Sequence, residues 1–388
     1  ENVVVELYAA GSTPGTDAPL QTDTTDGQGD YLFTGLAPGD YFVYIATPPS
    51  AYPTSSTPAS TDPDDDKDGD DDGVQATSGG SVSSGVITLV SQGEPVDGST
   101  ATSETDTGVN TSGKAQDNTS DSSGNMTVDF GFFAPVSLGS TVWFDANNDG
   151  IQSGTNEVGI ENVVVELYAA GSTPGTDAPL QTDTTDVQGD YYFGGLVEGD
   201  YFVHIPTAPS AYPTSSTPAS TDPDDNKDGD DDGVQATSGG SVSSGVITLS
   251  VDGEPENGTA DGTETDTGVN TTGKSQDDGA DNDGNMTVDF GFFKPVSLGS
   301  TVWFDANNDG IQSGAGETGI ENVVVELYAA GSTPGTDAPL QTDTTDAQGD
   351  YYFDGLAEGD YFVHIPTAPS SYPTSSTPAS TDPDDNKD

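Results

Sequence analysis

Cysteine is absent from the 388-residue sequence, arginine is absent as well, and histidine occurs only twice. Without cysteine there are no disulfides and no thiolate metal ligands, so redox chemistry does not indicate a compartment. A nucleophilic triad needs a base, and nothing in the sequence identifies the cleft that a catalytic carboxylate pair requires. The sequence therefore predicts a protein that is not an enzyme. His204 stands where the first repeated segment has Tyr44, and we expect it on an exposed strand face rather than in a metal site.

Basic residues are scarce, since six lysines oppose 67 acidic residues and the formal net charge is -61. Nucleic acids and anionic membranes bind proteins through Lys and Arg, so neither is expected as a partner. Repulsion among so many negative charges opposes folding into a compact state unless cations screen the charges. Divalent counterions are therefore expected from the composition. Adaptation to high salt is another explanation, but it predicts evenly spread acids, whereas here they are clustered.

Long apolar runs are also missing. No run approaches the roughly 18 residues that a membrane helix needs, so no membrane insertion is expected within this sequence. Hydrophobic residues make up 30% of the chain and lie in short blocks between stretches rich in Gly, Asp, Ser, Thr and Pro. Low hydropathy with high charge is typical of disorder. The clustering of the apolar residues instead indicates short strands separated by long polar loops.

An internal repeat dominates the sequence. The block that begins at Glu1 returns at Glu161 and Glu321, a period of 160 residues. We predict three β-sandwich repeats: residues 1–135 without the first strand, residues 136–295 complete, and residues 296–388 truncated at the C-terminal end. The sequence is thus expected to be a window from a longer array.

Alternating apolar residues mark the strands of the complete repeat. The predicted blocks are residues 138–144, 163–167, 180–184, 191–193, 201–205, 246–249 and 288–292. In the last block we expect Val288, Phe290 and Phe292 on the buried face and Asp289 on the opposite, exposed face. About seven short strands without a helical period predict an all-β fold of tandem Greek-key, Ig-like sandwiches.

Adjacent repeats are joined with almost no linker. The closing block of one repeat is followed by Lys294-Pro295 and then directly by the opening block of the next. Proline restricts itself and the residue before it, so the junction is short and stiff. This predicts a rod of domains, in which each repeat has neighbouring repeats of the same chain or fibre as partners.

A loop of alternating oxygen-bearing side chains follows the opening block. Residues 145–150 read Asp-Ala-Asn-Asn-Asp-Gly, and the same six residues recur at 305–310. Side chains at every second position of a tight turn, closed by a glycine, suit a hard cation such as Ca²⁺. An Asn/Asp/Gly-rich turn without metal is the alternative. The predicted ligands are Asp145, Asn147, Asp149, Glu157 and the backbone carbonyl of Ile151, with Asp305, Asn307, Asp309, Glu317 and Ile311 as counterparts.

A second acidic cluster follows a Pro-, Ser- and Thr-rich segment. Its predicted ligands are Asp222, Asp224, Asn226, Asp228, Asp230 and Asp232, with Asp62, Asp64, Asp66, Asp68, Asp70 and Asp72 in the first repeat. Dense carboxylates repel one another in an ordered loop, which favours metal, although most charge runs are solvated loops. A weaker cluster lies at residues 277–283. We expect two to three Ca²⁺ ions in a complete repeat.

These features resemble the B-type repeats of the serine-aspartate repeat (Sdr) family of bacterial surface proteins. Residues 138–145 are similar to the family's glycine, valine and tryptophan entry to the calcium loop, and residues 159–163 to its Gly-Ile-x-x-Val. Residues 188–193 resemble its hairpin and residues 287–292 its closing strand. The resemblance implies an SdrD B-like domain, a calcium-binding, prealbumin-like relative of the collagen-adhesin B module. One departure is that Glu157 falls at the thirteenth loop position, whereas the family has the acid at the twelfth.

The sequence and the resemblance together predict a calcium-stiffened stalk or fibre of a microbial cell surface or outside the cell, and the expected microbe is a bacterium. The alternative is an adhesin whose repeats bind a host, matrix or cell-surface ligand, such as a glycan. Near-identical repeats favour a spacer, because recognition sites tend to diverge. Either one chain makes the fibre or subunits assemble. Strand exchange between neighbouring molecules is conceivable, but the incomplete first and last repeats are explained more simply by the limits of the window.

Overall fold

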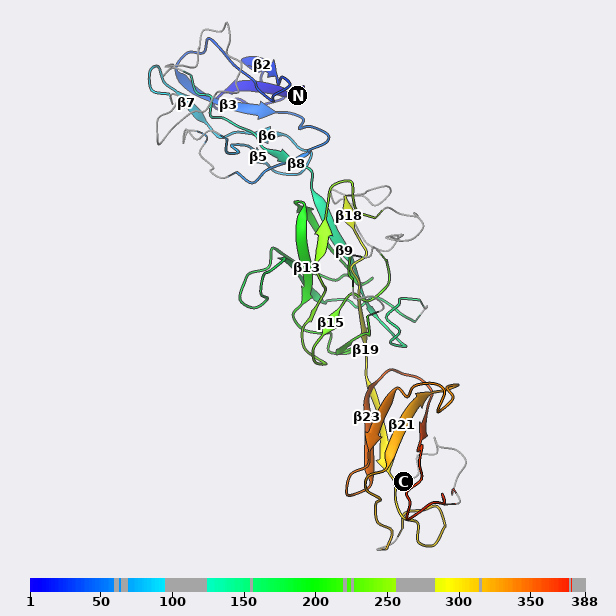
Figure 1. Cartoon of the computed structure of the whole chain (residues 1–388). Helices are drawn as coiled ribbons and strands as arrows, with labels where there is room; N and C mark the ends of the chain where they lie inside the picture. The colour runs from blue at the N-terminus through cyan, green and yellow to red at the C-terminus, as the bar shows by residue number, and fades with distance from the viewer. Residues whose placement is uncertain are drawn as a thin grey trace. The chain divides into compact units, whose positions relative to one another are not determined.

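The computed structural model describes residues 1–58, 63, 69–94, 124–153, 156–218, 222–224, 227–255, 283–313, 316–376 and 378. Throughout this part of the chain every regular element is a β-strand (Figure 1). The predicted all-β fold class, of tandem Ig-like sandwiches, is confirmed. A search of the same residues finds no helix with the length and hydropathy needed to cross a membrane.

The first repeat contains one main antiparallel sheet with the strand order β2-β1-β3-β6-β5, and β7 pairs with β3. Its strands are β1 (Val4–Ala9), β2 (Gln21–Thr24), β3 (Gly39–Ile45), β5 (Val74–Gln75), β6 (Val82–Ser83) and β7 (Ile87–Leu89). Leu7 lies opposite Val43 in the ladder. Alternate residues of β1 and β3 therefore point to one face, where Val5, Leu7, Val43 and Ile45 form the core. Two shorter strands, β4 (Thr54–Ser55) and β8 (Phe132–Phe133), pair with each other.

The middle repeat contains counterparts of the strands of the first repeat and some additional strands. They are β9 (Val136–Phe144), β10 (Val164–Ala169), β11 (Gln181–Thr184), β12 (Asp190–Leu196), β13 (Gly199–Ile205), β14 (Thr214–Ser215), β15 (Val234–Gln235), β16 (Val242–Ser243), β17 (Ile247–Leu249), β18 (Gly284–Asn285) and β19 (Phe290–Phe293). β10 pairs with β11, and β16 lies between β13 and β15. β19 runs parallel to β9, with Phe290 opposite Val142, and pairs on its other edge with β14.

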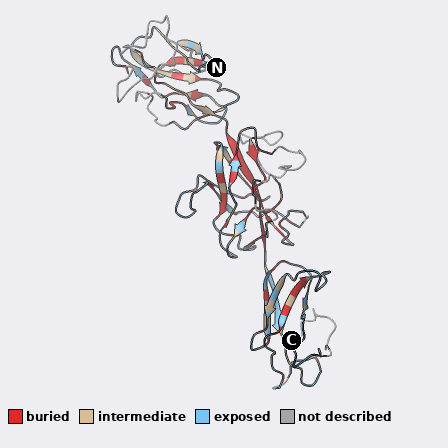
Figure 2. Ribbon diagram, viewed as in Figure 1, coloured by how far each residue is buried: buried red, intermediate tan, exposed pale blue. Residues whose placement is uncertain are grey.

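The closing strand of the middle repeat is buried on both faces, which contradicts the prediction for Asp289. Thr287 is 1% exposed and Asp289 is fully buried, although the alternation placed Asp289 on an exposed face. The reason is that Asp289, which directly precedes β19, has its carboxylate enclosed by Ser140 and Thr141 of β9 and by Gly229 of the second acidic cluster, all of which donate hydrogen bonds to it. β9 itself is almost entirely buried, as the red strand in Figure 2 shows.

The last repeat contains β20 (Val296–Thr301), β21 (Val324–Ala329), β22 (Gln341–Thr344), β23 (Asp350–Leu356) and β24 (Tyr361–His364). β20 pairs antiparallel with β23, and β21 lies between β22 and β24. Val325, Leu327 and Phe353 form the centre of its core. β20 has the same sequence as the first part of β9, yet most of it is exposed.

The structure also corrects the expectation for His204, whose side chain is only 8% exposed. Its Nδ1 lies 2.8 Å from Ser243 Oγ, and its ring lies edge-on to Tyr168. Burial lowers the pKa of His204, and the carboxylate of Glu166 opposes this effect. The position is covered because β16 places Ser243 beside it in the ladder.

Replacing His204 by tyrosine, as at position 44, should make stability less dependent on pH between about 7 and 5. The folded-state pKa lies below the unfolded value of about 6.5. As the pH falls, the unfolded state therefore takes up the proton first, and stability is lost below the unfolded pKa. Urea unfolding at the two pH values measures this loss of stability. The reciprocal change Tyr44→His should add pH dependence, and unchanged behaviour of both variants would contradict the argument.

Candidate metal centre

The candidate centre begins where β9 ends, with Asp145. Its buried carboxylate is wrapped by the following turn: Oδ1 accepts the N–H groups of Asn147 at 3.2 Å and Asn148 at 2.6 Å, and Oδ2 accepts the Gly150 N–H at 2.9 Å. Asn148 and Gly150 have φ values of 55° and 73°, which turn the backbone back around this carboxylate. Asn and Gly are the residues that adopt this left-handed conformation most readily. The local sequence thus builds the turn that was predicted to hold an ion.

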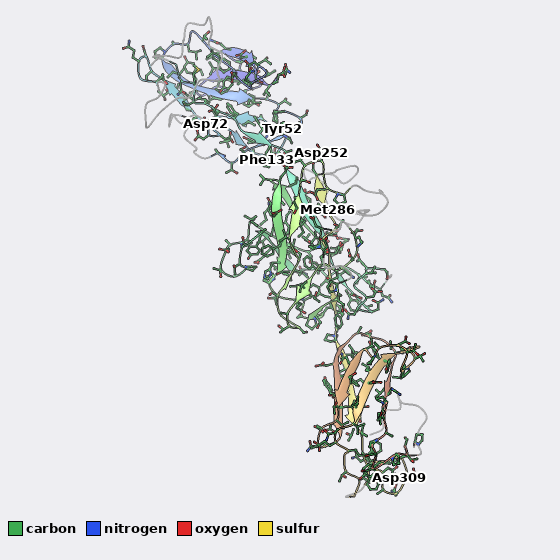
Figure 3. All side chains as sticks on the ribbon, in the orientation of Figure 1. Tyr52, Asp72, Phe133, Asp252, Met286 and Asp309 are labelled. Atoms are coloured by element: carbon green, nitrogen blue, oxygen red, sulfur yellow. The ribbon has the colours of Figure 1, made fainter. Side chains whose placement is uncertain are left out.

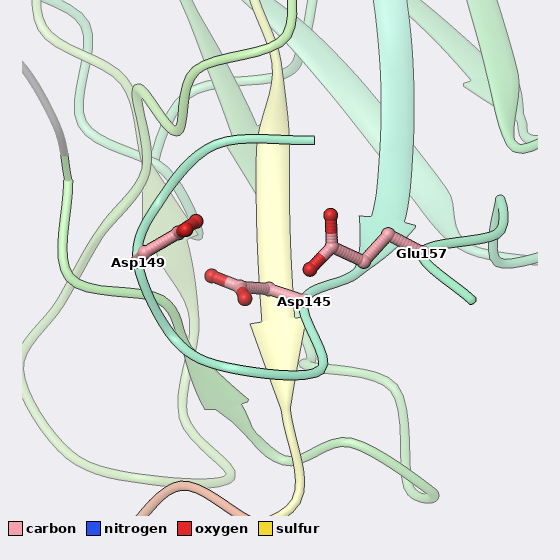
Figure 4. Close-up of side chains that lie close together, drawn as sticks. All are labelled: Asp145, Asp149 and Glu157. Atoms are coloured by element: carbon pink, nitrogen blue, oxygen red, sulfur yellow. The ribbon is translucent and has the colours of Figure 1, made fainter. Parts of the chain in front are cut away.

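Three carboxylates converge inside this turn. One oxygen from each of Asp145, Asp149 and Glu157 lies within 4.8 Å of the other two, and Figure 4 shows the side chains pointing toward one another. Oxygens that bind one Ca²⁺ at about 2.3–2.6 Å are at most about 5 Å apart. The separation therefore fits a shared calcium ion. Glu157 also accepts the Ser153 N–H at 2.7 Å, so the extra loop residue does not carry its carboxylate away from the centre.

The last repeat contains the same arrangement. Asp305 accepts the N–H groups of Asn308 and Gly310 at 2.6 and 2.9 Å. Oxygens of Asp305, Asp309 and Glu317 again lie within 4.8 Å of one another. Asp309 is marked in Figure 3. The geometry recurs because the loop sequence recurs, and it does not depend on the strand β19, which has no counterpart among the described residues of the last repeat.

The acidic run of the middle repeat pairs with the loop that begins at Asp145. The Asp231 N–H donates to the Gly150 carbonyl at 2.9 Å, and the Gln152 N–H donates to the Gly229 carbonyl at 2.6 Å. Between these bonds Ile151 forms an isolated antiparallel bridge with Asp230. The two clusters predicted as separate are thus joined into one region. That the Ile151 carbonyl binds an ion stays a prediction.

Asp231 has the most enclosed carboxylate of this run, although it was not among the predicted ligands. Its side chain is fully buried; Oδ1 accepts the N–H groups of Gly291 at 2.9 Å and Gly233 at 3.1 Å, and Oδ2 has no hydrogen-bond partner. A buried carboxylate oxygen without a donor is costly. The predicted ligands were every second residue of the run, which are the even-numbered acids. The pairing of the run with the loop instead turns the odd-numbered Asp231 inward.

Asp289, next to the closing strand, forms hydrogen bonds both with β9 and with the acidic run. Its Oδ1 accepts the Ser140 hydroxyl at 2.6 Å and the Thr141 N–H at 3.0 Å, and its Oδ2 accepts the Gly229 N–H at 2.8 Å. Asp232 and Asp289 also exchange two bonds, since the Asp289 N–H donates to Asp232 Oδ2 and the Asp232 N–H to the Asp289 carbonyl, both at 2.9 Å. The sequence offered one unused signal for Asp289, because aspartate is depleted in strands.

Burial changes the acidity of these groups. It raises the pKa of Asp232 to about 9, with neighbouring carboxylates adding to the effect, and it raises the pKa of Asp289 well above its usual range. A buried carboxyl resists ionisation at neutral pH unless something stabilises the charge. A cation held nearby is one such group. The site therefore combines the all-oxygen donor set that Ca²⁺ prefers with carboxylates that would gain from it.

The other predicted ligands differ in burial, and some of them lie outside the described residues. Asp222 is exposed, and Asp224 donates its N–H to Asp222 at 3.2 Å, which makes a local turn. Asp228 is half-buried and Asp230 is buried. In the first repeat Asp70 has two buried oxygens without hydrogen-bond partners, and Asp72, marked in Figure 3, accepts the Asp129 N–H at 3.0 Å. Asp62, Asp64, Asp66, Asp68 and Asn226, and residues 277–282 of the weaker cluster, lie outside the described residues.

Comparison with curated proteins finds relatives that are serine-aspartate repeat-containing proteins of staphylococci. The chain is 32% identical over 359 residues to serine-aspartate repeat-containing protein F of Staphylococcus epidermidis, which covers 91% of this chain and 16% of the relative. It is 33% identical over 362 residues to serine-aspartate repeat-containing protein D of Staphylococcus aureus, covering 92% of this chain and 20% of the relative. The chain thus spans no more than a fifth of the length of these two relatives.

Among solved structures, the Bacillus anthracis TIE protein matches with a TM-score of 0.26 and 13% identity, covering 95% of this chain and 42% of that one. The shaft pilin SpaA of Lactobacillus rhamnosus GG matches with a TM-score of 0.20 and 12% identity, covering 62% and 90%. The family model of the SdrD B-like domain matches residues 1–84, 136–253 and 296–388, that is, a part of every repeat. The predicted resemblance is confirmed, and the chain belongs to the SdrD B-like domain family.

Proposed function

We propose that this protein is a structural stalk of tandem β-sandwich repeats, stiffened by calcium. It is an extracellular protein of a bacterial cell surface. The observation that carries the proposal is the convergence of Asp145, Asp149 and Glu157 within 4.8 Å at the end of an opening strand, repeated in the last repeat. The proposed repeats are residues 1–135, 136–295 and 296–388. Its role is mechanical rather than catalytic.

Calcium would stiffen the repeat because the candidate calcium ligands belong to loop segments, which lie outside the hydrogen-bonded strands. The loop at residues 145–157 and the run at residues 227–233 are joined by the bonds at Gly150 and Gln152. An ion bound by Asp145, Asp149 and Glu157 would fix the loop, and through it the run. The inward-facing Oδ2 of Asp231 supports a second ion in the run, within the proposed two to three ions for a complete repeat.

Charge removal at the loop tests the calcium site. The double variant Glu157→Gln/Glu317→Gln keeps a side-chain oxygen that can accept the N–H groups of Ser153 and Ser313. It should raise the Kd for Ca²⁺ at these sites at least about tenfold, which corresponds to about 1.4 kcal/mol per site. Isothermal titration with CaCl₂ measures this. The exposed pair Glu161→Gln/Glu321→Gln removes the same charge outside the loop and is the matched control. Equal affinities in both variants would refute the assignment.

Calcium removal tests the stalk. Binding to the folded state alone should stabilise each site by about 2.7 kcal/mol at a hundredfold excess over Kd. We expect a chelator to lower the unfolding temperature, to increase cleavage by an added protease, and to lower the radius of gyration in small-angle scattering, because a rod that bends is shorter on average than a stiff one. The Glu157→Gln/Glu317→Gln chain should show part of these changes before chelation. Identical protease resistance and scattering with calcium and with chelator would exclude stiffening by calcium.

A further inference from the structure

We infer that the outward face of the main sheet is a docking surface for a cationic, amphipathic polypeptide segment, in which Lys or Arg alternates with apolar residues. In the first repeat this face is formed by β1, β2, β3 and β7, of which β2, β3 and β7 are labelled in Figure 1. None of the residues that carry the inference is a candidate metal ligand, and a polypeptide partner goes beyond the proposed stalk.

An apolar row crosses this face from strand to strand. Tyr8 lies opposite Phe42 in the ladder between β1 and β3, and their rings stack with centroids 5.4 Å apart. Leu20 lies on the other side of Tyr8, because the antiparallel register of β1 with β2 continues by one residue. Val86 lies on the far side of Phe42, because the register of β3 with β7 continues in the same way. Four apolar side chains thus lie side by side across the sheet.

This row points away from the core. Successive side chains of a strand alternate between the two faces, and the neighbours of the row along the strands, Leu7, Val43 and Ile87, belong to the core. Leu20 is 54% and Val86 is 52% exposed. The solvated face of an antiparallel sheet is normally polar. Contiguous exposed apolar side chains on such a face therefore indicate an interaction surface.

The middle repeat presents the same row. Tyr168 stacks on Phe202 with ring centroids 5.4 Å apart, and Leu180 and Val246 are 55% and 51% exposed. The strand order of this sheet is the same in the two repeats. The exposure of the row therefore follows from the sheet itself and recurs with it.

Carboxylates lie on both sides of the row. Asp40 stands two residues before Phe42 on β3, so it points to the same face about 7 Å away. Glu6 stands two residues before Tyr8 on β1. Because β1 and β3 are antiparallel, the two acids fall on opposite sides of the row. Beyond Glu6 follows Val4, which is 48% exposed, so the surface reads acid, apolar, acid, apolar along the strands.

Charge decides which partner suits this surface. No lysine or arginine lies among the described residues of the first repeat, so none of them neutralises Asp40 and Glu6. An anionic partner, or the same face of a second copy, would bring like charges together. A neutral partner would bury the two carboxylates without a counter-charge, which is costly. A cationic partner would pair with them while its Lys or Arg stems cover the apolar row.

An extended segment matches the spacing of these groups. In a strand every second side chain lies on one face, about 7 Å from the next. Lys at positions i and i+4, with apolar residues at i+2 and i+6, would therefore meet the acids and the apolar groups in register. The surface is also preformed, because Tyr8 is stacked on Phe42 and its hydroxyl donates to Glu6 Oε2 at 2.9 Å. Preformed groups lower the cost of binding.

The peptide Lys-Thr-Leu-Thr-Lys-Thr-Leu is the direct probe. Isothermal titration into the full chain, in calcium buffer at about 0.15 M salt, limits long-range attraction. We expect saturable binding, at least about tenfold tighter than that of Lys-Lys-Leu-Leu-Thr-Thr-Thr, which has the same composition and charge without the alternation. The peptide Gln-Thr-Leu-Thr-Gln-Thr-Leu should not bind.

Three outcomes of these titrations would overturn the inference. Equal affinity of the two lysine peptides would reduce the attraction to the net charge of the chain. Binding of the glutamine peptide as tight as that of the alternating lysine peptide would exclude a role for the carboxylates. The absence of saturable binding by the alternating peptide would exclude the surface altogether.

Charge removal locates the site on the sheet. Asparagine at the outward acid position keeps an oxygen for the neighbouring hydroxyl, such as that of Thr248, which donates to Asp200 at 3.0 Å. The variant is Asp40→Asn/Asp200→Asn/Asp360→Asn. The matched control removes three exposed charges outside the row and is Glu1→Gln/Glu161→Gln/Glu321→Gln. We expect at least about tenfold weaker binding of the alternating peptide to the first variant and unchanged binding to the control. Equal affinities of the two chains would contradict the assignment.

Removal of the exposed leucines tests the apolar row. Leu20→Ser/Leu180→Ser/Leu340→Ser changes side chains that are 54–55% exposed, so the unfolding temperature should stay the same while peptide affinity falls at least about tenfold. Val187→Ser/Val197→Ser, at exposed positions outside the row, should bind as the wild type does. Unchanged binding by the leucine variant would overturn the apolar contact. Weaker peptide binding at higher chain concentration, with a rise in mass by light scattering, would identify a second copy as the occupant and overturn the cationic partner.

Discussion

Asp289→Ala should lower the free energy of unfolding of the middle repeat by at least about 3 kcal/mol. The substitution leaves three donors without their acceptor: the buried Ser140 hydroxyl and the N–H groups of the half-buried Thr141 and Gly229. A buried donor left unsatisfied costs about 1–3 kcal/mol. The loss should also reach the metal centre, because Gly229 belongs to the acidic run. Denaturant unfolding, followed by calcium titration of the folded variant, measures both effects.

Asp129→Ala is the matched control in the first repeat. Asp129 likewise accepts the Gly69 N–H at 2.8 Å, but it is half-buried, whereas Asp289 is fully buried. Its substitution should therefore cost less. Asp289→Asn, which retains one carbonyl oxygen, should recover part of the loss. If Asp289→Ala and Asp129→Ala have equal effects, the hydrogen bonds from β9 are not what makes Asp289 important.

Gly159→Ala is expected to be as disruptive as Asp289→Ala or more so, with a loss of about 3–5 kcal/mol, the range of the largest single substitutions. A Cβ at this position would lie 1.6 Å from the Gln188 carbonyl oxygen and 2.1 Å from its carbon, so the 186–190 turn must move. That turn holds β9 through the bond from the Val142 N–H to the Gly189 carbonyl at 2.9 Å. Gly159 also follows the candidate ligand Glu157 by two residues, and calcium affinity should fall with stability.

Gly171→Ala separates this steric effect from backbone strain. Gly171 has a φ of 88°, and a Cβ there meets nothing within 4 Å, so its substitution should cost only about 1 kcal/mol. Thermal unfolding and calcium titration of the two variants provide the comparison. A Gly159→Ala chain as stable as Gly171→Ala would show that the turn can shift without loss, and the close approach would then have no structural importance.

Local periodicity determined much of this protein. The period of 160 residues, the strand blocks and the absence of helices were predictable because each depends on neighbouring residues. The convergence of Asp145, Asp149 and Glu157 was predictable for the same reason, since one short turn and a residue close behind it provide all three carboxylates. The one-residue extension before Glu157 did not matter, because its carboxylate is anchored by Ser153.

The tertiary structure decided what faces a strand or a loop from far along the chain. Asp289 was expected to be exposed, yet its carboxylate is buried against Ser140 and Thr141 of β9 and Gly229 of the acidic run, which lie far from it in the sequence. Asp231, rather than only its even-numbered neighbours, turns inward because the run pairs with Gly150 in the loop that begins at Asp145. Sequence alone specified which segments are able to form strands, whereas segments from far along the chain decided which side chains are buried, because burial depends on what packs against a strand or a loop.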